Sequence, residues 1–403
     1  MSASLGMETL LSGMGVEWRP LSELASLRRG RVMSKEYLID NSGIYPVYSS
    51  QTANEGMMGA IKTFDFDGEF ISWTTDGANA GTVFYRNGKF SITNVCGIIH
   101  VDRTQLNCRY LFYWLSTEAK KHVYAGMGNP KLMSNQVEKI LVPIPCPEEP
   151  EKSLAIQGEI ARILDAFTAM TDELSAELKS RRKQFSYYRE QLLTFDDGVV
   201  EHLPMGDERI GTFIRGSGLQ KKDFVSKGIG CIHYGQIYTH YGTYAYKTKS
   251  FVSDEFARKA RMAKHGDLVI ATTSENDEDV CKAVAWLGEE DIAVSSDACF
   301  YAHNLNPKYV SYFFQTEQFQ KQKRSYITGA KVRRVNVDNL AKIIIPVPSP
   351  EEQARVVSIL DKFETLTNSP EIGLPREIEL REKQYTYYRD LLLSFPVRHE
   401  LAA

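Results

Sequence analysis

The sequence lacks the residue spacing of a metal site, a disulfide-rich fold or a membrane span. Its six cysteines are scattered, and no two of them stand in a CxxC arrangement. No apolar run approaches the roughly 18 residues that a membrane-spanning helix needs. The first residues also lack the basic and apolar regions of a secretory signal. We therefore expect a cytoplasmic protein, in a reducing compartment, that holds no metal.

The motifs of common nucleotide-dependent and hydrolytic enzymes are also missing. There is no GxxxxGK phosphate loop, no HExxH helix and no GxSxG turn. The segment 216–218 begins like a dinucleotide loop, but Lys221 stands where its last glycine should be. The segment 128–131 resembles the tetrapeptide of amino-methyltransferases without its aromatic residue. These absences favour a chain with no catalytic residues and no cofactor of its own.

Neither sign of charge dominates the composition. The chain has 48 lysines and arginines against 51 aspartates and glutamates, which gives a formal net charge of −3. Nucleic-acid-binding domains usually carry a basic excess, so the total does not indicate such a partner. Contacts depend on the local field, however, and the basic residues are unevenly distributed.

The most informative feature present is an internal repeat. Three segments recur in the same order in the second half of the chain. They are 139–149, 163–167 and 181–195 in the first copy, and 342–352, 359–363 and 381–395 in the second. Fainter matches pair 16–17 with 200–201, 50–51 with 235–236, 68–75 with 266–273, and Lys131 with Arg334. The chain is therefore a tandem duplication of one module.

Each module ends in a long predicted helix. From about Ser153 to Thr194, apolar residues recur in alternating steps of four and three, which is the pattern of a coiled-coil seam. Roughly 40 helical residues would span about 60 Å. The second copy starts after Pro350, is interrupted at 368–375, and resumes at Pro375, because proline is tolerated in the first turn of a helix.

We expect the two helical rods to pack against each other antiparallel. That packing would bury both seams and hold the two β-rich domains at opposite ends, related by a pseudo-twofold axis. The alternative is that the seams bind helices of partner proteins.

The parts before the helices carry short β-branched and aromatic runs between glycine and asparagine turns, such as 81–86, 96–101 and 268–271. Each copy also contains one predicted helix, around 110–122 and 307–323. The fold class is therefore α+β. We divide the chain into a first β-rich domain (1–149), a first helical region (150–197), a second β-rich domain (198–349), a second helical region (350–396) and a tail (397–403).

Local basic clusters point to DNA. The window 321–334 contains six basic residues and no acidic one. Lysine and arginine neutralise phosphates, while Arg, Lys, Gln, Asn, Ser and Thr read base edges. Lys131 and Arg334 are the first choices for such contacts. The full candidate set is Arg28, Arg29, Arg31, Ser50, Gln51, Thr74, Thr75 and Lys131 in the first copy, and Lys221, Lys222, Gln236, Thr272, Thr273, Lys331, Arg333 and Arg334 in the second.

Each of these candidate residues also has an explanation that does not involve DNA. Basic loops are often only solvated, and β-propensity explains the paired threonines as well as base reading does. The basic residues between Arg258 and Lys264 look helical and fit a solvent-exposed face. For the whole chain, the alternatives are a coiled-coil scaffold that binds proteins, or an enzyme whose site has no recognisable motif.

The repeated segments closely resemble the specificity subunits of type I restriction-modification systems, particularly the type IC group. The residues that carry the likeness are the proline-rich junction through Gln157, the string 163–167, the helix 182–189, and the segments 374–381 and 387–390. The likeness covers essentially the whole chain. It is highly specific in the helical regions and weak in the β-rich domains.

The resemblance implies a division of labour. Each β-rich domain would be a target recognition domain that reads one half of an asymmetric, split double-stranded DNA site, and the helices would set the gap between the halves. Two modification subunits would bind around the helical regions, carry S-adenosylmethionine and methylate an adenine in each half. Two restriction subunits would join and cleave DNA with ATP and magnesium.

A short tandem unit supports the idea of a molecular ruler. Residues 171–174 and 175–178 are similar to the repeated tetrapeptide by which type IC members set the gap. Four more helical residues would add about 6 Å. The interruption at 368–375 departs from an ideal repeat, so the second rod is expected to bend there.

Overall fold

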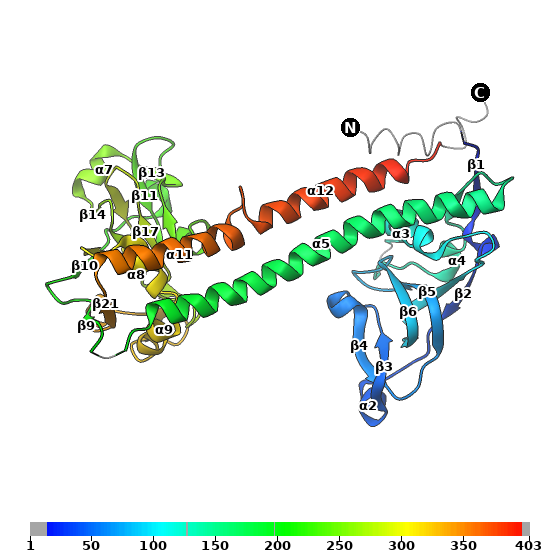
Figure 1. Ribbon diagram of the computed structural model, residues 1–403, viewed down its shortest axis with the longest axis horizontal. Coiled ribbons are helices and arrows are strands. Elements are labelled where there is room, and N and C mark those ends of the chain that lie inside the picture. Colours follow the sequence, from blue (N-terminus) through cyan, green and yellow to red (C-terminus); the bar gives the residue numbers. More distant parts are fainter. Residues whose placement is uncertain (1–13, 126–127, 197, 397–403) are drawn as a thin grey trace. The chain divides into compact units, whose positions relative to one another are not determined.

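The computed structural model describes residues 14–125, 128–196 and 198–396 (Figure 1). These residues form two compact units. The first unit comprises the described residues up to Leu174 and those from Ile378 onward, and the second unit is Ser175–Glu377. Each unit therefore contains one β-rich part and a section of each helical region. The tail expected at 397–403 lies outside the described residues.

The first unit is built on a six-stranded sheet in the order β2-β7-β5-β6-β3-β4. Neighbouring strands run antiparallel except β3 and β6, which are parallel. The strands are β2 (Ala25–Arg29), β3 (Ser42–Tyr48), β4 (Met57–Ile61), β5 (Phe66–Thr74), β6 (Val83–Ile92) and β7 (Cys96–Val101). The strands predicted at 81–86 and 96–101 lie in β6 and β7.

Short helices flank this sheet. They are α2 (Lys35–Asp40), α3 (Cys108–Glu118) and α4 (Ser134–Val137), with 3-10 turns at Leu21–Glu23, Ala53–Gly56 and Ala119–His122. Helix α3 and the turn after it account for the helix predicted around 110–122. Asn107 starts α3, because its Oδ1 accepts the backbone N–H of Tyr110 at 3.0 Å.

The second unit contains a five-stranded sheet in the order β10-β19-β15-β17-β12, a four-stranded sheet in the order β13-β11-β18-β14, and the pair β16-β20. The order β10-β19-β15-β17 matches β2-β7-β5-β6 of the first unit. The strands are β10 (Gly211–Arg215), β11 (Ile229–Ile232), β12 (Tyr244–Ala245), β13 (Ser250–Val252), β14 (Met262–Ala263), β15 (Leu268–Ala271), β16 (Thr273–Ser274), β17 (Ala283–Trp286), β18 (Ile292–Val294), β19 (Ala298–His303) and β20 (Arg333–Arg334).

The helices of the second unit correct two sequence expectations. The helices are α6 (Tyr234–Thr239), α7 (Asp254–Lys259), α8 (Pro307–Phe313), α9 (Glu317–Arg324) and α10 (Val337–Leu340), with a 3-10 turn at Lys221–Asp223. The helix predicted around 307–323 is two helices, because the Thr316 side chain accepts the N–H of Phe319 and starts α9 anew. Arg261 and Lys264 are not helical, since α7 ends at Lys259.

In each unit, a two-stranded ribbon leads into a long helix. In the first, β1 (Val16–Pro20) pairs antiparallel with β8 (Leu141–Pro145). In the second, β9 (Glu201–Pro204) pairs antiparallel with β21 (Ile344–Val347). Proline is tolerated in such ribbons because each strand has an unpaired edge. The proline-rich segments 143–147 and 346–350 thus lie at junctions between a strand and a long helix.

The long helices follow the predicted course. Helix α5 spans Pro150–Leu193 without a break, whereas the second copy is divided into α11 (Pro350–Asn368) and α12 (Leu374–Leu392). Figure 1 shows α12 running antiparallel to the first part of α5 in the first unit, and α11 antiparallel to the last part of α5 in the second.

Equivalent aromatic contacts join the helices within each unit. In the first unit, the rings of Phe167 and Tyr388 stack with centroids 5.1 Å apart. In the second, the ring of Phe363 stacks on Tyr188 at 5.4 Å and on Phe185 at 6.0 Å. Phe167 and Phe363 come from the recurring string 163–167 and 359–363. At these positions, each seam therefore binds the other helical region of the same chain.

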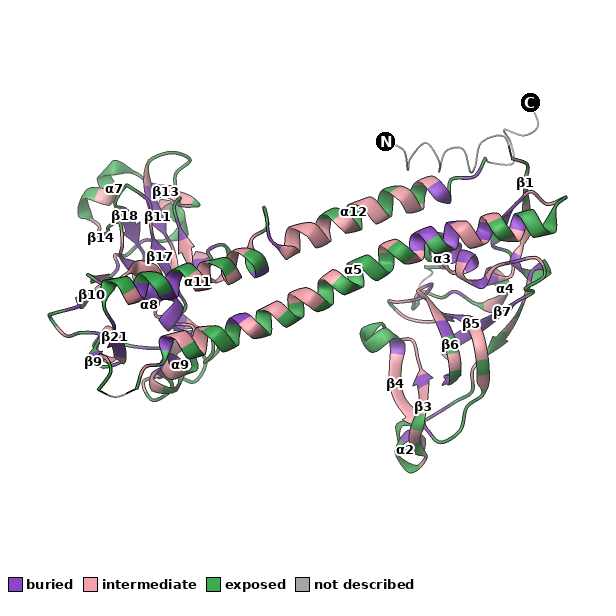
Figure 2. Ribbon diagram, viewed as in Figure 1, coloured by how far each residue is buried: buried purple, intermediate pink, exposed green. Residues whose placement is uncertain are grey.

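The helices also complete the cores of the β-rich parts. Figure 2 shows buried residues gathered in the sheets and along the stretches of helix that join them. Ile160, Leu164 and Leu392 belong to the same buried cluster as Trp73 of β5. The main cluster of the second unit likewise includes residues of α5 and α11. No helix among the described residues is both long and apolar enough to cross a membrane.

Candidate nucleic-acid interface

Lys131 and Arg334 occupy equivalent positions in the two units, as the repeat predicts. Backbone bridges join Lys131 to Asp76 and to Tyr124 across a loop. Matching bridges join Arg334 to Thr273 and, across its own loop, to Thr328. Both side chains are exposed. The fold thus presents one basic side chain at the same place in each copy, and its contact with DNA stays a prediction.

The paired threonines are shifted by one position relative to the sequence match. Thr75 donates its N–H to the carbonyl of Val95, and its carbonyl accepts the N–H of Leu132. In the second unit, Thr272 makes the corresponding bonds, with the carbonyl of Asp297 and the N–H of Val335. Thr75 therefore matches Thr272 rather than Thr273. A run of adjacent threonines hides such a slip, because only strand pairing reveals the register.

Three of the four threonine candidates are buried. Thr74, Thr75 and Thr273 are 1%, 0% and 7% exposed, and Thr272 is half-buried. The Thr272 hydroxyl donates to the carbonyl of Asp297 at 2.9 Å. These residues hold the ends of their strands in place, next to the loops that carry Lys131 and Arg334.

The first unit brings four side chains together at this strand end. Arg29, at the end of β2, donates from Nη2 to the Thr75 hydroxyl at 3.1 Å. That hydroxyl donates to Asp76 Oδ2 at 2.6 Å. Asp76 also faces Arg29 Nη2 and Lys131 Nζ, each at 3.9 Å. Two candidate cations thus share one carboxylate on the surface.

The residue after Arg29 is a glycine that lies close to a neighbouring backbone segment. A Cβ at Gly30 would collide with the carbonyl oxygens of Ile92 and Thr93, and a Cβ at Gly216 would collide with those of Val294 and Ser295. Only glycine permits such a close approach of two backbones. The segment 216–218 therefore contributes a packing glycine that corresponds to Gly30.

The remaining candidates of the first unit are Arg28, Arg31, Ser50 and Gln51, and Arg28, next to Arg29 in β2, points to the opposite face of the sheet. Arg28 is exposed, and Ser50 is half-buried. The Arg31 Nε donates to Asp65 at 2.9 Å, and a hydrogen bond to Tyr37 is the main factor that raises the pKa of Arg31. The exposed Gln51 donates from Nε2 to the carbonyl of Met57.

Sequence reasoning missed Arg86, which organises the loop containing Ser50 and Gln51. Its side chain is only 3% exposed. Its guanidinium lies 3.5 Å from the centre of the Tyr48 ring, and Nη2 donates to the Glu55 carbonyl at 2.6 Å. Burial lowers the pKa of Arg86. The only signal in the sequence was a charged residue within an apolar strand.

In the second unit, Thr273 lines a groove beside α6, and the described residues that line this groove include no other candidate. The Arg333 Nε pairs with Asp277 at 2.8 Å, whereas Lys331 is exposed. Gln236 on α6 donates to the Ser250 hydroxyl at 2.6 Å. The exposed Lys221 and Lys222 form a 3-10 turn with Asp223. Burial, and then the proximity of Lys221, lower the pKa of His233.

A cavity of about 450 Å³ lies between α6 and the strand end at Thr273. Tyr238 of α6 lines it and donates from its hydroxyl to the Thr273 carbonyl at 2.7 Å. The loop after β16, which carries Glu275, Asn276 and Asp279, forms the other wall. Among the described residues, no group of three or more His, Cys, Asp or Glu side chains could hold a metal ion.

Lys323, named in the sequence only as part of a basic window, is fully buried. Its Nζ donates to the carbonyls of Glu278 at 3.0 Å and Val280 at 2.9 Å. Burial lowers the pKa of Lys323. This lysine therefore supports the acidic loop beside the groove and is not itself available to DNA.

Residues 14–181 and 239–380 match the family described as type I restriction modification DNA specificity domain. The chain belongs to this family. A type I restriction enzyme specificity subunit of Escherichia coli is 34% identical, with 98% of each chain covered. A putative one of Haemophilus influenzae is 32% identical, covering 96% of this chain and 98% of its own.

Solved structures agree on the fold. The type I restriction-modification S subunit from M. genitalium aligns with a TM-score of 0.55 and 16% identity, covering 96% of this chain and 97% of its own. A chain from a structural study of complex assembly and conformational transition in a type I system aligns at 0.59 and 12% identity, covering 96% and 99%. The protein is thus a specificity subunit, which recognises DNA within a restriction-modification complex and leaves catalysis to other subunits.

Proposed function

We propose that this specificity subunit reads a split, asymmetric DNA sequence, one half with each β-rich domain. Residues 1–149 and 198–349 would be the target recognition domains, and the regions 150–197 and 350–396 would set the gap. The observation that carries the proposal is the equivalent placement of Lys131 and Arg334, each exposed beside the end of a central strand. Two equivalent DNA-reading surfaces on one chain suit a DNA sequence with two halves.

The clusters differ in ways that suit two different half-sites. In the first unit, Asp76 lies between Arg29 and Lys131. In the second, the matching residue is Thr273, beside the groove lined by α6. Base contacts specify sequence, whereas phosphate contacts fix position. Two domains that share a fold but carry different side chains at this place would read different bases.

The partners in this proposal are double-stranded DNA, two modification subunits and two restriction subunits. The modification subunits would bring S-adenosylmethionine and methylate one adenine in each half, after that base leaves the stack. The restriction subunits would bring ATP and magnesium. The tandem unit at 171–178 supports placement in the type IC group.

The test is a matched pair of substitutions, Lys131→Met and Arg334→Met, in the complex with its modification partner. Each should weaken DNA binding by roughly tenfold, since a base or phosphate contact contributes about 1–3 kcal/mol. Sequencing of methylated adenines should show that Lys131→Met relaxes one half-site and Arg334→Met the other. Arg258→Met, on the exposed face of α7, is the control and should change neither. Unchanged affinity and unchanged half-sites in both variants would refute the proposal.

A further inference from the structure

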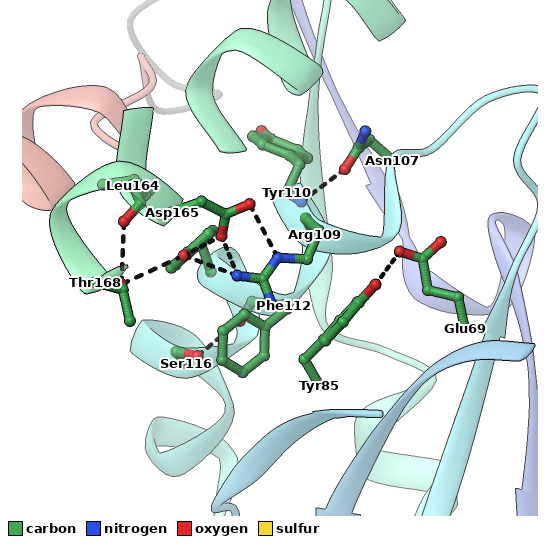
Figure 3. Close-up of polar contacts among 11 residues, drawn as sticks. Glu69, Tyr85, Asn107, Arg109, Tyr110, Phe112, Ser116, Leu164, Asp165 and Thr168 are labelled. Atoms are coloured by element: carbon green, nitrogen blue, oxygen red, sulfur yellow. Dashed lines mark hydrogen bonds and ion pairs between the residues drawn. The ribbon is translucent and has the colours of Figure 1, made fainter. Parts of the chain in front are cut away.

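A polar cluster ties the first β-rich part to α5 (Figure 3). Arg109 on α3 donates from Nε to Asp165 Oδ2 at 3.2 Å and from Nη2 to Asp165 Oδ1. Tyr113, one turn further along α3, donates from its hydroxyl to the same Oδ1 at 2.5 Å. The Arg109 guanidinium lies 4.3 Å from the centre of the Tyr85 ring. Burial, and then the bond to Asp165, raise the pKa of Tyr113, so its hydroxyl remains a donor at neutral pH.

The second unit repeats this cluster with a lysine. Lys308 on α8 donates from Nζ to Asp361 Oδ2 at 2.6 Å. Tyr312 donates from its hydroxyl to Asp361 Oδ1 at 2.7 Å. The Lys308 Nζ lies 3.8 Å from the centre of the Tyr244 ring. Asp165 and Asp361 are the aspartates of the recurring strings 163–167 and 359–363, so the repeat seen in the sequence contains this contact.

The ring over the cation is kept although its residue has moved. Tyr85 lies in β6 opposite Ile71, and the corresponding place in β17, opposite Leu268, holds Ala285. In the second unit the ring comes from Tyr244 on β12, which pairs directly beside Ala285. The two copies have thus replaced both the cation and the source of the ring while keeping carboxylate, hydroxyl, cation and ring together.

A second bond joins the same helices two turns away. The backbone N–H of Asn107, at the start of α3, donates to Gln157 Oε1 of α5 at 2.8 Å. In the second unit, the N–H of Asn306 donates to Gln353 Oε1 of α11 at 2.7 Å. Each recognition domain is therefore held to its long helix at two separated points. Two points of attachment define an angle, which one point does not.

The polar groups do something that apolar packing cannot. Apolar burial is non-directional and tolerates a small change of angle, whereas hydrogen bonds weaken steeply away from linear geometry. Charge-assisted bonds to one carboxylate from two donors are stronger and more restrictive still. The cluster therefore adds orientation to a contact that the core already makes.

We propose that Asp165 and Asp361 are positioning residues that fix the angle of each recognition domain on its helix, and so the gap that the protein accepts between half-sites. The inference rests on the proposed function. For a domain with a radius of gyration of about 15 Å, a tilt of about 13° moves a point one such radius from the pivot by about 3.4 Å, which is one base-pair step. A small loss of angular restraint is therefore enough to admit a neighbouring gap length.

The test uses the full chain with its modification partner and a DNA library in which the gap is randomised in length. Asp165→Asn and Arg109→Met should raise the share of selected sites with a gap one base pair too long or short by roughly tenfold, the factor expected for one lost charge-assisted bond. The bases of both half-sites should stay the same. Asp361→Asn and Lys308→Met should act alike.

The second copy supplies a matched control. Arg109→Lys places in the first unit the cation that the second unit uses. Unlike Arg109→Met, it should therefore leave the wild-type gap distribution unchanged. A purely structural role would show instead as a lowered melting temperature with an unchanged gap, and that result would overturn the inference. So would a change of half-site bases without a change of gap. If the wild-type complex selects no split site at all, the proposed function itself fails.

Discussion

Asp76 and Thr273 show how one position gives the two copies different electrostatics. Asp76 lies 3.9 Å from both Arg29 and Lys131, so part of their positive charge is already neutralised. Thr273 has no charge, and Arg334, paired with it in the strand, is exposed. Phosphate attraction depends on uncompensated positive charge. We therefore expect DNA binding by Arg29 and Lys131 to depend more on hydrogen bonding, and DNA binding by Arg334 to depend more on charge.

Cysteine reactivity is a direct test at this scale. Burial raises the pKa of Cys96, Cys108, Cys231 and Cys281 to about 12, and it also raises that of the fully buried Cys299. A raised pKa keeps these thiols protonated at pH 8, and the thiolate is the nucleophile. Cys146 alone among the six is not buried.

We therefore predict that iodoacetamide at pH 8 labels one thiol quickly in the native chain, as counted by intact mass. Cys146→Ser should abolish that fast reaction, and unfolding in denaturant should expose all six thiols. Rapid labelling of a second cysteine in the native chain would contradict the buried environments described above.

At the scale of elements, the two helical regions behave differently although their sequences recur. Helix α5 is continuous, whereas the second region divides at Ser369, with α12 starting at Leu374. A Cβ at Gly373 would collide with the carbonyl oxygen of Thr365. The interruption therefore folds back tightly against the end of α11, and glycine is needed there.

The continuity of α5 through 171–178 supports a prediction on gap length. A third copy of the unit 171–174, inserted after residue 178, should extend α5 by about 6 Å and slightly more than one turn. The accepted gap should lengthen correspondingly, by one to two base pairs at about 3.4 Å each. A library with randomised gaps measures the change.

Length, not the inserted side chains, is the physical cause in this prediction. An insertion of four other helix-forming residues is therefore the control and should have the same effect. An unchanged gap after both insertions would show that α5 does not act as a ruler.

At the scale of the whole molecule, the charge balance bears on how DNA is bound. A formal net charge of −3 provides little long-range attraction for a polyanion. We therefore expect the partner subunits to supply much of the phosphate contact, with this chain contributing base contacts at the ends of its central strands.

Because a specificity subunit leaves catalysis to other subunits, the purified chain should transfer no methyl groups. Incubation with radiolabelled S-adenosylmethionine and DNA should leave the DNA unlabelled, and addition of the modification partner should produce labelled adenine. Transfer by the homogeneous chain alone would be incompatible with its assignment as a non-catalytic subunit.

The sequence by itself determined the duplication, the long helices and the junctions before them. Helical periodicity and capping are local properties, written within a few residues, so the seam through Phe167 and the restart near Pro375 could be read directly. The equivalence of Lys131 and Arg334 also followed, because each stands eight residues before a recurring segment, which begins at Lys139 in the first copy and at Lys342 in the second.

Only the tertiary structure decided which side chains meet. Strand register pairs Thr75 with Thr272, and the burial of Lys323 and Arg86 depends on elements far away in the chain. The exchange of Tyr85 for Tyr244 could not be seen in any alignment of the two copies, because the ring moved to a neighbouring strand. Sheet pairing is non-local, and a contact kept by substitution from another strand leaves no trace in sequence order.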